Sequence, residues 1–152
     1  MEIQINGLNE LMKMADKFPA VSEKHIGTAI QRSLIRIQDT AKTSAPFGTS
    51  GQLRNNWDLR VGRYEGSLRS NAQAGGFPYG SAVEFGTRPH FPPVSALSLW
   101  AKRKGLNPFV IARSISRKGT KANPFFQNSI DAQRNNVAKE FDNALDAIIK
   151  EL

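Results

Sequence analysis

Two side chains in the middle of this sequence have the types that general acid–base chemistry requires. Glu84 and His90 lie six residues apart, with Gly86 and Pro89 between them. Proton transfer needs a carboxylate and an imidazole in a fixed geometry, and no third group stands close by in the sequence to orient the imidazole. We therefore favour a structural role for Glu84, in which an arginine or backbone N–H groups hold its carboxylate.

The sequence contains few residues that could support other catalytic or metal-binding chemistry. The chain of 152 residues contains no cysteine and two histidines, so thiolate chemistry is excluded and a transition-metal site lacks ligands. A metal-dependent nuclease needs clustered carboxylates, and residues 45–123 contain only Asp58, Glu65 and Glu84. We expect a protein without enzymatic activity, cofactor or metal.

Charge is distributed unevenly along the chain. Residues 1–44 carry six basic and five acidic side chains, residues 45–123 carry twelve and three, and residues 124–152 carry three and five. The middle segment therefore holds the whole excess behind the formal net charge of +8. A basic surface of this kind attracts nucleic acid or an acidic protein partner, and the composition does not choose between them.

The elements that position these residues begin with two helices. Ile3 and Ile5 indicate an extended start, and apolar residues then recur at helical spacing up to Phe18, where Pro19 predicts a break. A longer helix with one apolar face is expected from Pro19 to the Ala45-Pro46 pair. This second helix is long enough to cover a small sheet.

A three-stranded antiparallel sheet is expected next. Residues 47–51 have the composition of a loop, residues 57–61 alternate as a half-buried strand, and residues 67–73 would return as its hairpin partner. Alternation over residues 79–85 predicts a third strand, which ends in a stiff loop rich in glycine and proline. The predicted core face of the sheet carries Trp57, Tyr79 and Phe85.

Three helices are expected after that loop. The first ends at Lys102-Arg103-Lys104-Gly105, and the second runs from the Asn107-Pro108 pair to Gly119. The last begins after Asn123-Pro124, and because Arg134 interrupts its apolar face, we expect its first turns to be partly solvated. The elements together predict a single α+β domain over residues 1–152: a long N-terminal helix packed on a small three-stranded antiparallel sheet, with short helices and a C-terminal helix.

Three short motifs occur in order along the chain. They are Ala45-Pro46 with Thr49, Gly51, Leu53 and Arg54, where Ser50 is inserted; Val83-Glu84-Phe85-Gly86-Thr87; and Gly119-Thr120-Lys121-Ala122-Asn123-Pro124-Phe125-Phe126. In order and spacing they resemble motifs of a family of tailed-bacteriophage virion proteins, the neck or tail-completion proteins of the minor tail protein Z type. The resemblance extends from about Ala45 to the C-terminus.

The resemblance implies a structural virion protein of a bacteriophage or prophage, acting at the head–tail interface in tail completion or head–tail joining. It would form a homo-oligomeric ring and contact other neck and tail proteins, such as a head-completion protein, a tail terminator or the tail tube. The protein would contact genomic DNA only as the DNA passes through the ring. Because the sequence shows neither a signal peptide nor a membrane-spanning run, we expect assembly in the bacterial host cytoplasm.

Two groups of residues would carry this function. The structural loop comprises Tyr79, Glu84, Phe85, Gly86 and Thr87, where Gly86 permits a backbone turn that other residues resist. The interaction surface comprises the cations Arg54, Arg88, Lys102, Arg103, Lys104, Arg117, Lys118 and Lys121. We hypothesise that this surface meets the acidic C-terminal helix of a neighbouring copy or of another neck protein. The alternative function is a basic, non-enzymatic nucleic-acid-binding protein of a phage or mobile element.

Overall fold

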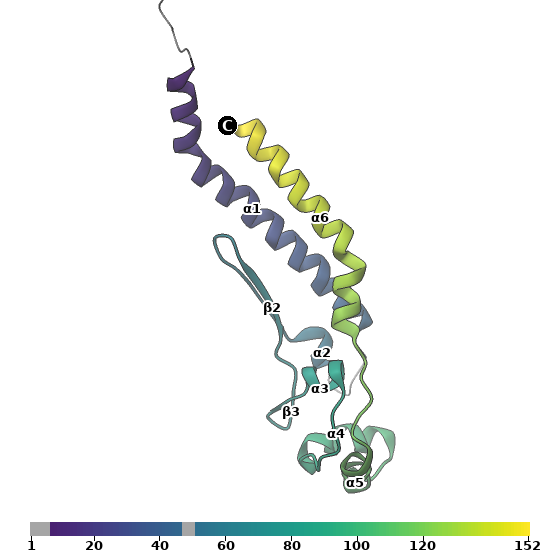
Figure 1. Ribbon diagram of the computed structural model, residues 1–152. Coiled ribbons are helices and arrows are strands. Elements are labelled where there is room, and N and C mark those ends of the chain that lie inside the picture. The colour runs from purple at the N-terminus through teal and green to yellow at the C-terminus, as the bar shows by residue number, and fades with distance from the viewer. Residues whose placement is uncertain (1–6, 47–50) are drawn as a thin grey trace, which may run out of the picture.

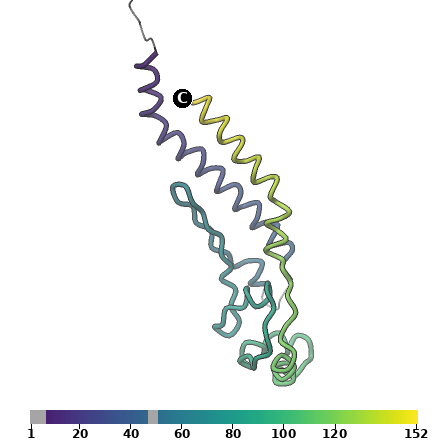
Figure 2. Tube along the Cα trace, viewed as in Figure 1, coloured from purple at the N-terminus to yellow at the C-terminus, as the bar shows by residue number. Residues whose placement is uncertain are grey.

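The computed structural model describes residues 7–46 and 51–152 of the chain. Two long helices, α1 (Leu8–Ser44) and α6 (Phe125–Glu151), run side by side in opposite directions and form the long axis of the molecule (Figure 1). The intervening segment lies along one side of α1 and extends past the end of this helix pair (Figure 2). The expected extended start at Ile3 and Ile5 and most of the expected loop at 47–51 lie outside the described residues.

The N-terminal part of the fold is one helix where two were expected. Pro19 lies inside α1, and Figure 1 shows this helix bending in its N-terminal part. An internal proline removes one helical hydrogen bond and clashes with the preceding turn, which costs about 3 kcal/mol and is relieved by a bend. The Ser22 hydroxyl donates to the Pro19 carbonyl at 3.0 Å. The predicted break after Phe18 is therefore wrong, because the chain stays helical through the proline.

A β-hairpin packs on α1, as the sequence predicts. After the short α2 (Gln52–Asn55), strands β1 (Trp57–Val61) and β2 (Gly66–Ser70) pair antiparallel, from Trp57 opposite Ser70 to Val61 opposite Gly66. A Cβ atom added at Gly66 would lie 2.5 Å from the Ile30 side chain. The absence of a side chain at this position lets the end of the hairpin touch the long helix.

The predicted third strand is wrong, and the sheet is not three-stranded. Strands β3 (Gln73–Ala74) and β4 (Phe77–Pro78) form a separate two-stranded piece, and residues 80–85 form the helix α3 (Gly80–Phe85). The N–H of Val83 donates to the carbonyl of Tyr79 at 3.0 Å, which closes the first helical turn. In a helix, Tyr79 and Val83 share one face because they lie four residues apart, and both pack against the core. The coarser prediction of a long helix packed on a small antiparallel sheet is confirmed.

A cluster of buried apolar residues lies where the end of α1, the hairpin, α3 and the start of α6 meet. Its members are Ala45, Leu53, Ala72 and Phe125, with Trp57, Tyr79, Val83 and Phe126 packed against them. Trp57 and Tyr79 thus face the core, as expected. The first turns of α6 are also part of it, since Phe125 and Ser129 are buried. The outer side of these turns is exposed at Gln127, Asn128 and Asp131, so the first turns of α6 are partly solvated, as expected.

Two helices that were predicted correctly lie beyond this junction. Helices α4 (Val94–Lys104) and α5 (Pro108–Lys118) pack on each other at the end of the molecule opposite the C-terminus (Figure 1). Gly105 closes α4 at φ 66°, and the Asn107 side chain accepts the N–H of Phe109 at 2.9 Å to begin α5. Among the helices of the described ranges, none is both long and apolar enough to span a bilayer.

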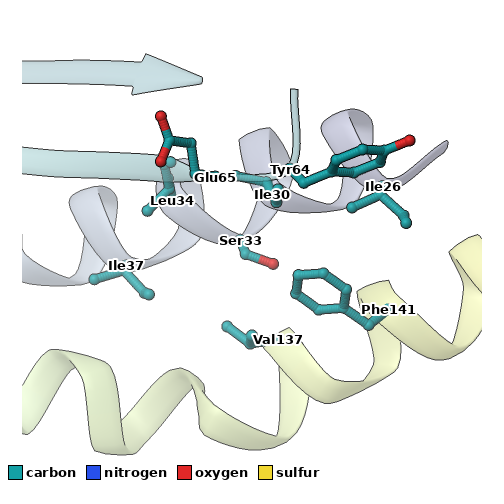
Figure 3. A pocket seen from close by; sticks show the side chains of 10 residues that line it. Ile26, Ile30, Ser33, Leu34, Ile37, Tyr64, Glu65, Val137 and Phe141 are labelled. Atoms are coloured by element: carbon teal, nitrogen blue, oxygen red, sulfur yellow. The ribbon is translucent and has the colours of Figure 1, made fainter. Parts of the chain in front are cut away.

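An apolar hollow of about 300 Å³ opens between α1, the β1–β2 turn and α6 (Figure 3). Its lining includes Ile26, Ile30, Leu34, Val137 and Phe141. Ser33 contributes the one polar group of α1 in this lining, and its hydroxyl oxygen is buried without a hydrogen-bond partner. The packing between the long helices is therefore incomplete at this point.

Candidate functional site

Glu84 joins the end of α3 to the start of α6. Its side chain is buried, and its two carboxylate oxygens accept the backbone N–H groups of Phe126 and Gln127, both at 2.9 Å. The first N–H groups of a helix have no partner within that helix, and a carboxylate also interacts favourably with the positive end of the helix dipole. Pro124 occupies the N-cap position of α6 and supplies no side-chain cap. Of the two partners that the sequence left open for Glu84, the backbone N–H groups are confirmed.

A two-residue bridge follows Glu84 in the chain. Thr87 and Thr120 exchange two backbone N–H···O=C bonds of 3.1 Å, and their hydroxyl oxygens lie 3.0 Å apart. The residue before each threonine is a glycine at φ 69°, a region that other residues resist. A Cβ atom at Gly86 would lie 2.5 Å from the carbonyl oxygen of Thr120, and one at Gly119 would overlap the carbonyl oxygen of Thr87. We call this pair of Gly-Thr dipeptides the threonine bridge.

The threonine bridge brings two of the three sequence motifs into contact. Residues 83–87 and 119–126 pair at the bridge, through Glu84 and through a bond from the N–H of Asn123 to the carbonyl of Val83 at 2.9 Å. The remaining motif also reaches this region, since Leu53 belongs to the core cluster there. Thr49 and Ser50 lie outside the described residues. The expected role of Gly86 in a tight backbone turn agrees with its geometry.

The two aromatic residues of the predicted loop differ in position. Tyr79 directly precedes α3, is half-buried and packs against the core cluster. Phe85 ends α3 with 78% of its surface exposed. The expected core position of Phe85 is therefore wrong, because a helix turns this residue to a different side than a strand would.

Glu84 and His90 do not form a hydrogen-bonded pair. Both oxygens of Glu84 are engaged by α6, and Nδ1 of the exposed His90 lies 2.9 Å from the carbonyl oxygen of Arg88. In the part of the chain that the structure describes, no three His, Asp or Glu side chains come together as metal ligands could.

The predicted interaction surface separates into two places. Arg54 is half-buried and donates from Nε to the carbonyl of Ala45 at 3.0 Å, at the end of α1. The other cations of that prediction are exposed and lie between residues 88 and 121. They are Arg88, Lys102, Arg103, Lys104, Arg117, Lys118 and Lys121. We call residues 88–121 the cationic segment. It includes α4 and α5, and the threonine bridge brings the chain at its two ends together.

Sequence reasoning missed two groups of charged residues that join α1 to α6. Arg36 donates twice to Oε1 of the buried Glu140, at 3.0 and 2.9 Å, and Arg32 approaches the other oxygen at 3.7 Å. At the far end, Lys24 and His25 both contact Glu151, at 2.8 and 2.7 Å. These partners lie more than a hundred residues apart, so no local pattern could have paired them.

Hydrogen bonds lower the pKa of two carboxyl groups of α6. The bond from Lys24, followed by the one from His25, holds the pKa of Glu151 below its ordinary value. At the other end of the helix, the bond from Arg134, followed by the one from Gln127, lowers the pKa of Asp131. Both carboxyl groups are therefore ionised at neutral pH and already have cationic partners within the chain.

Comparison of the chain with family models, with curated proteins and with solved structures finds no match.

Proposed function

We propose that the chain is a structural virion protein of a tailed bacteriophage or prophage, which acts in tail completion or head–tail joining as a homo-oligomeric ring. The phage assignment comes from the resemblance of three motifs. It is supported by the packing of those motifs, because residues 83–87 and 119–126 fit together at the threonine bridge. Motifs that matched by accident would have no reason to meet in space.

Assembly is supported by the large surface of the isolated chain. Its accessible surface is 10696 Å² for a mass of 16.8 kDa, whereas a compact monomer of this mass exposes about 7,700 Å². The ten residues outside the described ranges are too few to account for an excess of about 3,000 Å². A protein interface of standard size buries about 800 Å² on each partner. Ten fully extended residues expose about 1,600 Å², so at least about 1,400 Å² of the excess remains, which is more than one such interface buries on this chain.

The observation that carries the proposal is an apolar stripe on the first turns of α1. Leu8, Leu11, Met12 and Phe18 lie at helical spacing, and each exposes half or more of its surface. A helix of a monomer turns such a stripe toward its own core, and exposed apolar patches of this kind mark protein interfaces. The nearby end of α6 adds the exposed side chains of Leu145 and Ile149. A neighbouring subunit would cover this end of the molecule.

The stripe can be tested with a matched pair of variants. Leu8→Gln with Leu11→Gln removes apolar side chains from the stripe, and Asn9→Gln with Lys13→Gln changes the same turns outside it. We expect the first variant to lower the oligomeric mass measured by light scattering, alone or with neck partners, and the second to leave it unchanged. Equal masses for both variants would contradict a contact through α1.

The virion role has a genetic test. Deletion of the gene from the phage or prophage should leave filled heads and separate tails in electron micrographs, and expression of the protein in trans should restore joined particles. Complete and infectious virions without the protein would rule out the proposal. The alternative, a nucleic-acid-binding protein of a mobile element, would then be the better assignment.

A further inference from the structure

The cationic segment alone accounts for the net charge of the chain. Residues 88–121 contain eight basic side chains and no carboxylate, so their formal charge equals the +8 of the whole chain and the remaining residues sum to zero. All eight side chains are exposed. They are Arg88, Lys102, Arg103, Lys104, Arg113, Arg117, Lys118 and Lys121. A charge of one sign collected in one part of the surface produces a field that attracts anions.

These cations have no carboxylate partner within the described residues. Every ion pair found there is made by other basic side chains, on α1, on α6 or in the β1–β2 hairpin. The cationic segment is therefore not neutralised by its own chain.

The acidic helix of a neighbouring copy fits this surface poorly. Of the five carboxylates on α6, Asp131, Glu140 and Glu151 are held in ion pairs within the chain, which leaves Asp142 and Asp146. Two carboxylates cannot balance eight cations. The charge ratio favours a partner with a much higher density of negative charge than α6.

The outer face of α5 has the side chains that a phosphate group requires. An open hollow of about 360 Å³ lies on it, lined by Val110, Arg113, Ser114, Arg117 and Lys118. Residues three and four positions apart share one side of a helix, so these side chains form a single face, while Ala112 is buried. A guanidinium group can donate two parallel N–H bonds to one phosphate, and the serine hydroxyl adds a further donor.

The cations also extend along the whole length of this helix pair. Lys102, Arg103 and Lys104 end α4 beside the turn to α5, and Arg117 and Lys118 lie at the other end of α5, next to the threonine bridge. A helix of 11 residues is about 16 Å long. Each strand of a duplex presents a phosphate about every 3.4 Å along its axis, so several phosphates fall within this distance.

We propose that the cationic segment binds the sugar-phosphate backbone of double-stranded nucleic acid through the outer face of α5, without reading the base sequence. A duplex is favoured over a single strand because its phosphates are regularly spaced, as are the basic side chains that recur three and four residues apart on the rigid helix α5. The binding does not depend on the chain being a virion protein. It concerns a different end of the molecule from the apolar stripe of α1.

The test measures binding of a labelled 24-base-pair DNA duplex to the full chain over a series of salt concentrations. The first variant combines Arg113→Gln, Arg117→Gln and Lys118→Gln. The control combines Lys13→Gln, Lys17→Gln and Lys139→Gln, which removes the same charge from exposed positions on α1 and α6. Each lost phosphate contact lowers the slope of log K against log salt by about 0.9. We expect the magnitude of the slope to be about 2.7 smaller for the first variant than for the unchanged protein. The control should have the same slope as the unchanged protein.

Three results would overturn the proposal. They are an absence of duplex binding by the unchanged protein at low salt, an equal loss of slope in both variants, and binding of a poly-glutamate peptide as tight as that of the duplex at the same ionic strength. The last would assign the surface to an acidic protein. Circular dichroism checks that the first variant is folded, and a second variant with Arg113→Lys and Arg117→Lys should retain most of the slope, because it keeps the charge.

Discussion

The two helix pairs of this molecule use charge in opposite ways. Between α1 and α6, Glu140 and Glu151 each contact two basic side chains of the other helix. The pair α4 and α5 contains six basic side chains and no acidic one. In the first pair, ion pairs hold together helices that are far apart in the sequence. In the second, a three-residue turn already joins the helices, and no ion pair of the described residues includes their cations.

The largest expected effect is at the threonine bridge, which connects the two helix pairs. Gly86→Ala places a Cβ atom against the carbonyl of Thr120 at φ 69° and ψ −177°, a region that is almost closed to other residues. We expect a loss of about 3 kcal/mol in the free energy of unfolding, measured with urea. Gly105→Ala is the control, since Gly105 has a similar φ of 66° but no atom within 4 Å of an added Cβ. It should lose about 1 kcal/mol, and equal losses would show that the close contact is unimportant.

A smaller effect is expected within the α1–α6 pair. Glu140→Gln keeps the shape of the side chain but removes the charge that Arg36 and Arg32 contact. Hydrogen bonds to charged groups contribute about 2 kcal/mol, so we expect a decrease of that size in the free energy of unfolding. The matching change in the other pair, Lys104→Gln, should alter stability by less than about 0.5 kcal/mol. The contrast between the helix pairs would fail if both substitutions had the same effect.

The same contrast predicts a local dependence on pH. Because Lys24 and His25 lower the pKa of Glu151, this contact stabilises the fold above the ordinary value of 4.5 and is lost as the pH falls through the lower folded value. We expect faster amide hydrogen exchange in the last turns of α6 at acid pH, after correction for the intrinsic rate. Residues of α4 and α5 should show no such change. Glu151→Gln should remove the pH dependence, and its persistence in that variant would assign the effect to another carboxyl group.

The smallest effect is expected at the one unsatisfied group between the long helices. Ser33 places a buried hydroxyl in the apolar hollow of Figure 3. Ser33→Ala removes a polar group that has no partner, and we expect it to be neutral or to stabilise the fold by up to about 1 kcal/mol. A clear destabilisation in thermal unfolding would show that the hydroxyl has a partner in solution, such as a bound water molecule.

Local signals predicted the parts of the fold that depend on neighbouring residues. Asn107-Pro108 and Gly105 marked the ends of α4 and α5 correctly, because caps act within one turn. The helix break predicted at Pro19 is wrong. The lost hydrogen bond and the steric clash of an internal proline are relieved by a bend, and α1 extends well past Pro19 on both sides. Local rules therefore located the caps of α4 and α5, but they did not show that α1 continues through Pro19.

The candidate site shows the limit of sequence reasoning more sharply. Residues 79–85 were predicted as a strand, yet residues 80–85 form the helix α3. What gives this helix its place is the contact of Glu84 with Phe126 and Gln127, more than forty residues away. The pairing of Glu140 with Arg36 spans a still longer separation. Such contacts follow from the arrangement of whole elements, and one sequence contains no signal for them.

At the threonine bridge, residues 88–119 leave the rest of the fold and return to it at one place. Where two residues exchange both backbone bonds, their Cα atoms lie about 5.5 Å apart, so the chain departs and comes back at nearly the same point. A short linker between Thr87 and Thr120 could replace everything in between while the cap on α6 stays in place. Such a replacement would remove the contact of α4 with β3 but would leave in place the carboxylate of Glu84 and the backbone N–H groups that it accepts.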